Sequence, residues 1–186
     1  MLRWALVALI LVLVTLLLLT LLPDRRAEAP DADIHLFEAR ITLYPEADPD
    51  AIWTFVVPEA RYDPLAETTT LLDLREGSRS EGGEVDFTIE GEEVIIDRND
   101  DLRGDHLRAV LLADGLELDM EARQGRQVVV DQRAGRFEVP RANITGDGLD
   151  GVYEDMRIAF DFTEFEAGGP GTVGYATFEA DRVGAD

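Results

Sequence analysis

Two kinds of hydrophobic pattern follow one another along the chain. Residues 4–22 read WALVALILVLVTLLLLTLL, an apolar run without a charge whose only polar side chains are two threonines. After Pro30 the pattern changes to short runs in which apolar and polar residues alternate, as in Val85–Glu90. A long continuous run predicts a helix, whereas alternation with a period of two predicts strands that bury one face.

The apolar run is long enough to cross a membrane, because a helix of about 20 residues spans a hydrocarbon core of roughly 30 Å. Pro23, Asp24 and two arginines end it abruptly. We therefore expect a transmembrane anchor at residues 1–23 and a linker at residues 24–33. A cleaved signal peptide is the alternative reading, since Ala27-Glu28-Ala29 has the small-x-small form of a cleavage site. Its apolar stretch would be unusually long, and the proline that follows disfavours cleavage.

The side of the membrane on which the body lies is set by two opposing signals. Arginine counts alone, with Arg3 before the run and Arg25 and Arg26 after it, would place the body inside. The very short N-terminal tail and the need to export a β-domain favour an external body. We expect a single-pass protein of the inner membrane with its body in the periplasm or extracytoplasmic space.

The body, residues 34–183, has the pattern of an all-β domain. The segment Gly77–Gly83 reads as a loop, and Leu102–Ala113 is a helical candidate weakened by Gly104, with a strand at Leu107–Leu112 as the alternative. About ten or more antiparallel strands separated by glycine turns predict a sandwich, roll or barrel. The predicted strands are Ile52–Val57, Thr68–Leu74, Val85–Glu90, Val94–Asp97, Leu116–Ala122, Gln127–Asp131, Arg136–Val139, Arg157–Thr163 and Thr172–Glu179.

Charge narrows the range of partners. The chain has 39 acidic residues against 17 basic ones, a formal net charge of −22, and every basic residue is arginine. Such a charge repels phosphate backbones, so we expect no nucleic-acid partner. Cysteine is absent, which excludes disulfides, thiolate nucleophiles and cysteine-ligated metals.

Residues suited to catalysis are few, and we expect no enzymatic activity and no cofactor. The serines are Ser78 and Ser80 and the histidines are His35 and His106, with no nucleophile-elbow pattern around either serine. Asp97–Asp101 begins like a calcium loop, but Leu102 replaces the required glycine and Arg108 the bidentate glutamate. This segment reads as an acidic turn, and we expect no metal site.

Large apolar side chains recur on one face of four of the predicted strands. They either fill an ordinary core or, if two sheets splay apart, line a trough for acyl chains. Periodicity does not separate these alternatives. The candidate lipid-contacting residues are Trp53, Phe55, Val57, Phe87, Ile89, Phe137, Val139, Phe160 and Phe162.

The order of these parts resembles the LptC family, the single-span component of lipopolysaccharide export with an OstA-like β-jellyroll. Leu43-Tyr44-Pro45-Glu46, the strand Ile52–Val57 and Ala60-Arg61-Tyr62 are similar to that family's opening strand pair. Residues 144–151 (ITGDGLDG) resemble its late turn, and Gly148 matches the turn glycine. The resemblance covers residues 1–180.

The resemblance implies a non-enzymatic lipid relay. Such a protein accepts a lipopolysaccharide-like or other amphipathic lipid from an ABC transporter in the inner membrane and passes it to a periplasmic jellyroll by strand pairing. Two features depart from the family: Ala47-Asp48-Pro49-Asp50 replaces an expected glycine, and the acidity disfavours phosphorylated headgroups unless cations bridge them. The alternative is an extracytoplasmic scaffold or assembly domain that binds no lipid.

Overall fold

The computed structural model describes residues 33–113, 115–146, 150–168 and 176–179. These residues form an all-β structure of antiparallel strands with no helix. The expected anchor and linker, the signal-peptide alternative and Gly148 lie outside the described residues. Within the described part, no helix is long and apolar enough to cross a membrane.

Within the described residues, the strands follow one another along the chain without an intervening helix. The first four form a meander, in which β2, β3 and β4 are the longest of the described strands. The strands are β1 (Ile34–Leu43), β2 (Ala51–Asp63), β3 (Thr68–Glu81), β4 (Glu84–Ile96), β5 (Leu102–Gly104), β6 (His106–Leu111), β7 (Leu116–Glu121), β8 (Val128–Asp131), β9 (Arg136–Thr145), β10 (Gly151–Ala159), β11 (Glu164–Ala167) and β12 (Ala176–Glu179).

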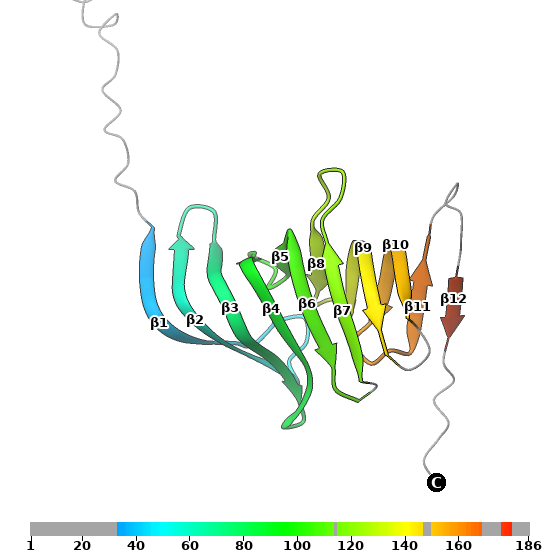
Figure 1. Cartoon of the computed structure of the whole chain (residues 1–186). Coiled ribbons are helices and arrows are strands. Elements are labelled where there is room, and N and C mark those ends of the chain that lie inside the picture. The colour runs from blue at the N-terminus through cyan, green and yellow to red at the C-terminus, as the bar shows by residue number, and fades with distance from the viewer. Residues whose placement is uncertain (1–32, 114, 147–149, 169–175, 180–186) are drawn as a thin grey trace, which may run out of the picture. The chain divides into compact units, whose positions relative to one another are not determined.

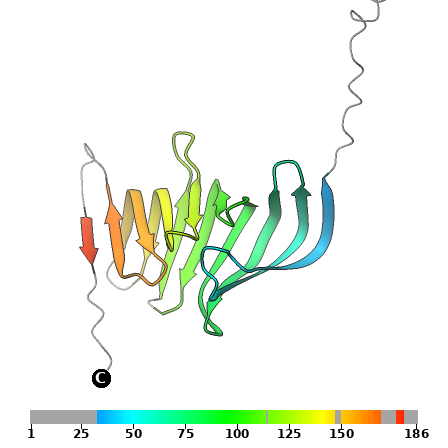
Figure 2. The ribbon, with the colours of Figure 1, turned by 180° about the vertical axis from the view of Figure 1, so that it is seen from behind.

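Six of these strands close on themselves to form a barrel. One edge of β4 pairs with β3, while its other edge is shared between β5 and β6. In the same way, β9 pairs with β10 on one edge and with β7 and β8 on the other. Because β5 pairs with β8 and β6 with β7, the ring β4-β5-β8-β9-β7-β6 is complete. Figure 1 and the reverse view in Figure 2 show β1–β3 continuing the sheet on one side of this ring and β10–β12 on the other.

Alternation along the strands builds one apolar interior. In β7, Leu116, Leu118 and Met120 are buried while the residues between them face outward. One row of inward side chains runs across neighbouring strands in register, from Trp53 through Arg79 and Phe87 to Leu111. Arg79 is the charged member of this otherwise apolar row.

A proline interrupts the ladder between β2 and β3. Pro58 lies in β2, where the pairing with β3 shifts between Val56 and Glu59. Nearby Glu38 and Asp73 both have positive φ, 51° and 53°. Proline cannot donate to the ladder, and a bulged neighbour lets the sheet bend there. The alternation of buried residues therefore changes phase across this crease, from Val57 to Ala60 in β2.

Two glycines allow the strands to approach closely. A Cβ on Gly77 of β3 would lie 2.7 Å from Cγ2 of Ile89, and a Cβ on Gly91 of β4 would lie 2.7 Å from Cδ2 of Leu107. Real Cβ atoms do not make contacts this short. Both glycines are therefore packing residues inside strands rather than turn residues.

The structure corrects three predictions from the sequence. Gly77–Gly83 is not a loop: β3 continues to Glu81, and the turn is formed by Gly82 and Gly83. The strand predicted at Arg157–Thr163 ends at Ala159, so Phe160 and Phe162 lie in the following turn. The helical candidate at 102–113 is wrong, because β5 and β6 occupy it, whereas the strand alternative is confirmed.

Candidate functional site

The predicted lipid-contacting residues come together in the interior. Five of the aromatic rings form one connected cluster with centroid separations of 5.1–5.6 Å. Phe87 lies at its centre and contacts Trp53, Phe137 and Phe160, so the cluster joins β2, β4, β9 and the turn after β10. Val57, Ile89 and Val139 are buried in the same core.

Most of these side chains have almost no exposed surface. Trp53, Phe55, Phe87 and Phe137 are each 0% exposed, and Phe160 is 8% exposed. Phe162 differs: it is only partly buried, and its φ of 55° places it in a turn. The rings therefore pack against one another in the described structure, as in a close-packed protein core.

Arg79 is a buried charge that the sequence did not reveal, because its segment was read as a loop. Its side chain is 4% exposed and its guanidinium lies 5.1 Å from the centre of the Phe160 ring. It donates hydrogen bonds to Asp48, Asp86 and Glu81, the last at 3.1 Å. Arg79 therefore links the β1–β2 turn, the β3–β4 hairpin and the turn after β10.

A hollow of about 550 Å³ opens beside Arg79. Its lining combines the Phe160 ring and small apolar residues with carboxylates from the β1–β2 turn, from β3, β4 and β11, and from the turn after β10. Among the residues that the structure describes, two buried side-chain nitrogens lack a hydrogen-bond partner: Nε of Arg79 and Nε2 of Gln132. Gln132 accepts a 3.1 Å hydrogen bond from the Trp53 indole through its Oε1. This end of the aromatic cluster thus retains unused donor capacity, which is costly in a buried position.

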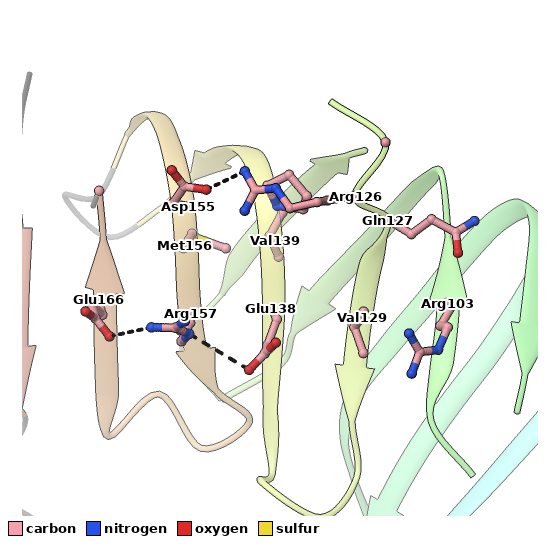
Figure 3. Close-up of a pocket in the computed structure, with 13 residues that line it drawn as sticks. Arg103, Arg126, Gln127, Val129, Glu138, Val139, Asp155, Met156, Arg157 and Glu166 are labelled. Atoms are coloured by element: carbon pink, nitrogen blue, oxygen red, sulfur yellow. Dashed lines mark hydrogen bonds and ion pairs between the residues drawn. The ribbon is translucent and has the colours of Figure 1, made fainter. Parts of the chain in front are cut away.

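A second hollow, of about 640 Å³, lies on the outer face of β5, β8, β9, β10 and β11. Figure 3 shows most of its charged side chains paired with one another: Arg157 lies between Glu138 and Glu166, and Arg126 reaches Asp155. Their arginine–carboxylate distances are 2.6–3.9 Å. The remaining charged side chain, Arg103, pairs with Asp97 outside the hollow. Because the ion pairs are exposed and mutually satisfied, this hollow has no strong preference for a ligand charge.

A third hollow, of about 430 Å³, follows the outer side of the Pro58 crease. Val56, Val57 and Pro58 form its floor, with acidic side chains and Arg75 around them. Arg75 is bound by Asp73 at 2.8 Å, and this interaction raises the pKa of the guanidinium.

The free edge of β1 carries apolar side chains. Among the described strands β1 pairs with β2 alone, which leaves its other edge unpaired. Ile34 is 52% exposed and Leu36 45% exposed. Leu36 lies opposite the buried Ala60, so it belongs to the same face as the core.

The acidic turn predicted at Asp97–Asp101 is present. The Asp97 carboxylate accepts hydrogen bonds from the backbone of Asn99 and from Nε of Arg103 at 2.8 and 2.9 Å. Burial raises the pKa of Asp101, although its carboxylate accepts a hydrogen bond from the Gln132 backbone. Within the described part of the chain, no group of three or more histidine or acidic side chains could hold a metal.

The two histidines form separate exposed ion pairs on different strands. His35 lies 3.3 Å from Glu59, and His106 lies 2.5 Å from Asp119. Glu59 also accepts a hydrogen bond from Arg61, which together with His35 lowers the pKa of the Glu59 carboxyl. Each histidine therefore has an acid partner, but neither partner pair includes a serine.

No protein-family model matches the sequence. No curated protein matches it either.

Proposed function

We propose that this chain is a membrane-anchored, extracytoplasmic lipid-relay protein that resembles LptC. In this proposal, an N-terminal helix tethers a β-jellyroll to the inner membrane. The jellyroll receives an amphipathic lipid from an ABC transporter and passes it to a periplasmic partner. The observation that carries the proposal is the continuity of the apolar inner face with the unpaired edge of β1.

That continuity can be followed along one row of the sheet. Val94, Leu71, Ala60 and Leu36 lie opposite one another in successive strands from β4 to β1. Their exposed fractions are 0%, 0%, 1% and 45% in that order. The inner face therefore runs from the core to solvent without a polar residue in this row. An added strand would extend this apolar face onto a second protein.

The backbone of β1 supports docking by strand addition. Its unpaired edge offers N–H and C=O groups over ten residues. Proteins often protect such an edge with charged side chains, proline, a bulge or a short strand. In β1 the charged Glu38 and Arg40 and the positive φ of Glu38 lie in the later part of the strand, so Ile34–Phe37 is the least protected part of the edge. Main-chain hydrogen bonds to a partner strand would supply affinity, and the exposed Ile34 and Leu36 would supply specificity.

The nine candidate residues are the proposed wall of the lipid path. These side chains pack together in the core. Acyl chains could therefore enter only if the strands that carry these side chains moved apart. The Pro58 crease supports such a movement, because the ladder is already interrupted along that line.

A scaffold that binds no lipid is the second candidate. The close-packed aromatic cluster favours the scaffold, because the rings bury one another and stabilise the fold without any ligand. In that case the β1 edge would serve assembly alone.

Photo-crosslinking in the native membrane separates the two candidates. A photoreactive amino acid replaces Leu36 in the full chain or, as the control, Thr42, an exposed residue on the outer face of the same strand. The relay predicts lipid and protein adducts at position 36 but no lipid adduct at position 42. Protein adducts without lipid at position 36 would favour the scaffold, and absence of any adduct there would contradict both candidates.

A further inference from the structure

The hollow beside Arg79 lies between the β3–β4 hairpin and the turn that follows β10. Its lining includes Arg79 of β3 and Asp86 of β4, and also Phe160 and Thr163 from the turn after β10. One wall is Phe160, a member of the aromatic cluster that forms the proposed lipid path. A molecule whose chains entered the cluster at this end would leave its headgroup in the hollow.

The buried guanidinium requires an acceptor. Nε of Arg79 is buried and has no hydrogen-bond partner, although the terminal nitrogens of the same side chain bind Asp48, Asp86 and Glu81. A buried donor without an acceptor costs about 1–3 kcal/mol. Arg79 lines the hollow. A ligand oxygen that moved inward far enough to contact Nε would remove this cost, so the ligand should carry acceptor oxygens.

The surrounding charge excludes a ligand with net negative charge. Five carboxylates line the hollow, from Asp48, Glu81, Asp86, Asp161 and Glu164, and Arg79 is the single basic residue among the lining residues. Like charges in a partly enclosed space repel more strongly than in bulk water. A bare phosphate or polyphosphorylated headgroup is therefore disfavoured, whereas an ammonium group near Asp161 and Glu164 would be attracted.

We propose that this hollow binds a zwitterionic, ammonium-bearing headgroup of the relayed lipid. Acceptor oxygens would meet Arg79, and the ammonium group would meet Asp161 and Glu164. The inference rests on the proposed lipid relay and adds to it the class of lipid. Phosphoethanolamine is the simplest headgroup with this chemistry.

Native mass spectrometry of the full chain in a mild non-ionic detergent tests the inference. The probes are phosphatidylethanolamine and phosphatidylglycerol with identical acyl chains, mixed in equal amounts, and free glycerophosphoethanolamine, a zwitterionic phosphodiester without acyl chains, in a separate sample. The test variant is Asp161→Asn with Glu164→Gln, which keeps the turn acceptor that receives the Thr163 hydrogen bonds. The control variant is Glu92→Gln with Glu117→Gln, two exposed acids of β4 and β7 outside the hollow.

We expect the native chain and the control variant to carry at least about fivefold more phosphatidylethanolamine than phosphatidylglycerol, equivalent to about 1 kcal/mol. The test variant should lose this preference. All three proteins have the same N-terminal sequence, so lipid bound by that segment contributes equally to each and does not affect the comparison between them.

The remaining outcomes separate the inference from the function on which it rests. Equal binding of both lipids by the native chain, or a preference kept by the test variant, would overturn the headgroup site and leave the relay intact. Absence of any lipid adduct would overturn the relay itself. If free glycerophosphoethanolamine bound as tightly as the lipid, the acyl chains would contribute nothing, which contradicts the relay but supports the headgroup site.

Discussion

The indole Nε1–H of Trp53 donates a 3.1 Å hydrogen bond to Oε1 of Gln132, a residue 79 positions later in the chain. Both side chains are buried, with exposed fractions of 0% and 2%. This bond is a polar connection inside the aromatic core between β2 and the turn that follows β8. Its burial means that loss of the acceptor cannot be compensated by solvent.

Gln132→Leu should therefore destabilise the protein by about 1–3 kcal/mol, since the Trp53 N–H would be left without an acceptor. Chemical denaturation followed by tryptophan fluorescence and circular dichroism measures the change. In a cycle with Trp53→Phe, the loss from Gln132→Leu should be smaller, because that background has no indole donor to satisfy. Equal losses in both backgrounds would contradict a Trp53–Gln132 interaction.

Arg79→Met should destabilise the protein by about 3 kcal/mol, near the lower limit for breaking a buried ion pair. The carboxylates of Asp48, Glu81 and Asp86 keep some contact with water, which limits the cost. Arg75→Met is the control, because the Arg75 side chain is 78% exposed and its ion-pair partner is Asp73 on the same strand. A loss below about 0.5 kcal/mol at both sites would show that the Arg79 network adds little stability.

Asp101→Asn should stabilise the folded state near neutral pH. Burial raises the folded-state pKa of Asp101 above the ordinary value, so ionisation of this carboxyl opposes folding when the pH exceeds that pKa. As the pH falls through the raised pKa, the native protein takes up its proton and the advantage of the variant should shrink. Asparagine can still accept the Gln132 backbone hydrogen bond. Thermal unfolding of both proteins across this pH range measures the difference, and an advantage that grew on acidification would refute the assignment.

Salt should stabilise the folded body. Residues 1–32 contain three arginines and three acidic residues, so the whole net charge of −22 belongs to the remainder of the chain. Raising the salt concentration from about 0.1 M to 1 M shortens the Debye length from about 10 Å to about 3 Å, which weakens self-repulsion. The melting temperature should rise alike in sodium and potassium chloride. No rise, or a rise with only one of these cations, would argue against simple screening.

Gly77→Ala should destabilise the protein by about 1–3 kcal/mol, because the new methyl group would overlap Ile89 in a packed interior. Gly151→Ala is the matched control, since the nearest heavy atom to its new Cβ would be 3.4 Å away, on the Tyr153 ring. Denaturation midpoints of the two variants give the comparison. Equal losses of stability in the two variants would mean that β3 and β4 can move apart to accept the new methyl group without a loss of free energy.

The sequence predicts the strands in which apolar and polar residues alternate without a break. It does not predict a strand in which the inward-facing positions shift by one residue partway along. Leu116–Ala122 was predicted and β7 ends one residue earlier. No strand was predicted at Ile34–Leu43, because its inward residues are even-numbered before Glu38 and odd-numbered after it, and the positive φ of Glu38 is not visible in the pattern.

The candidate site was predictable only in its apolar part. Alternation identified Trp53, Phe55 and Phe87, because large side chains at alternate positions of a strand share a face. Arg79 could not be found in this way, since a charged residue between serines next to glycine is typical of a loop. Its burial depends on carboxylates 31 residues before it and 7 residues after it, which only the register of β3 and β4 brings together.

Because six strands close into a ring, the body should resist mechanical force unevenly. Tension applied to the chain before Ile34 acts on a strand held along one edge only, so the pairs with β2 would open one after another from Tyr62. The ring strands β4 and β9 are held along both edges, and their rupture requires several ladders to break together. A pull from the N-terminal side would thus release β1 as a free segment while the aromatic core stayed folded.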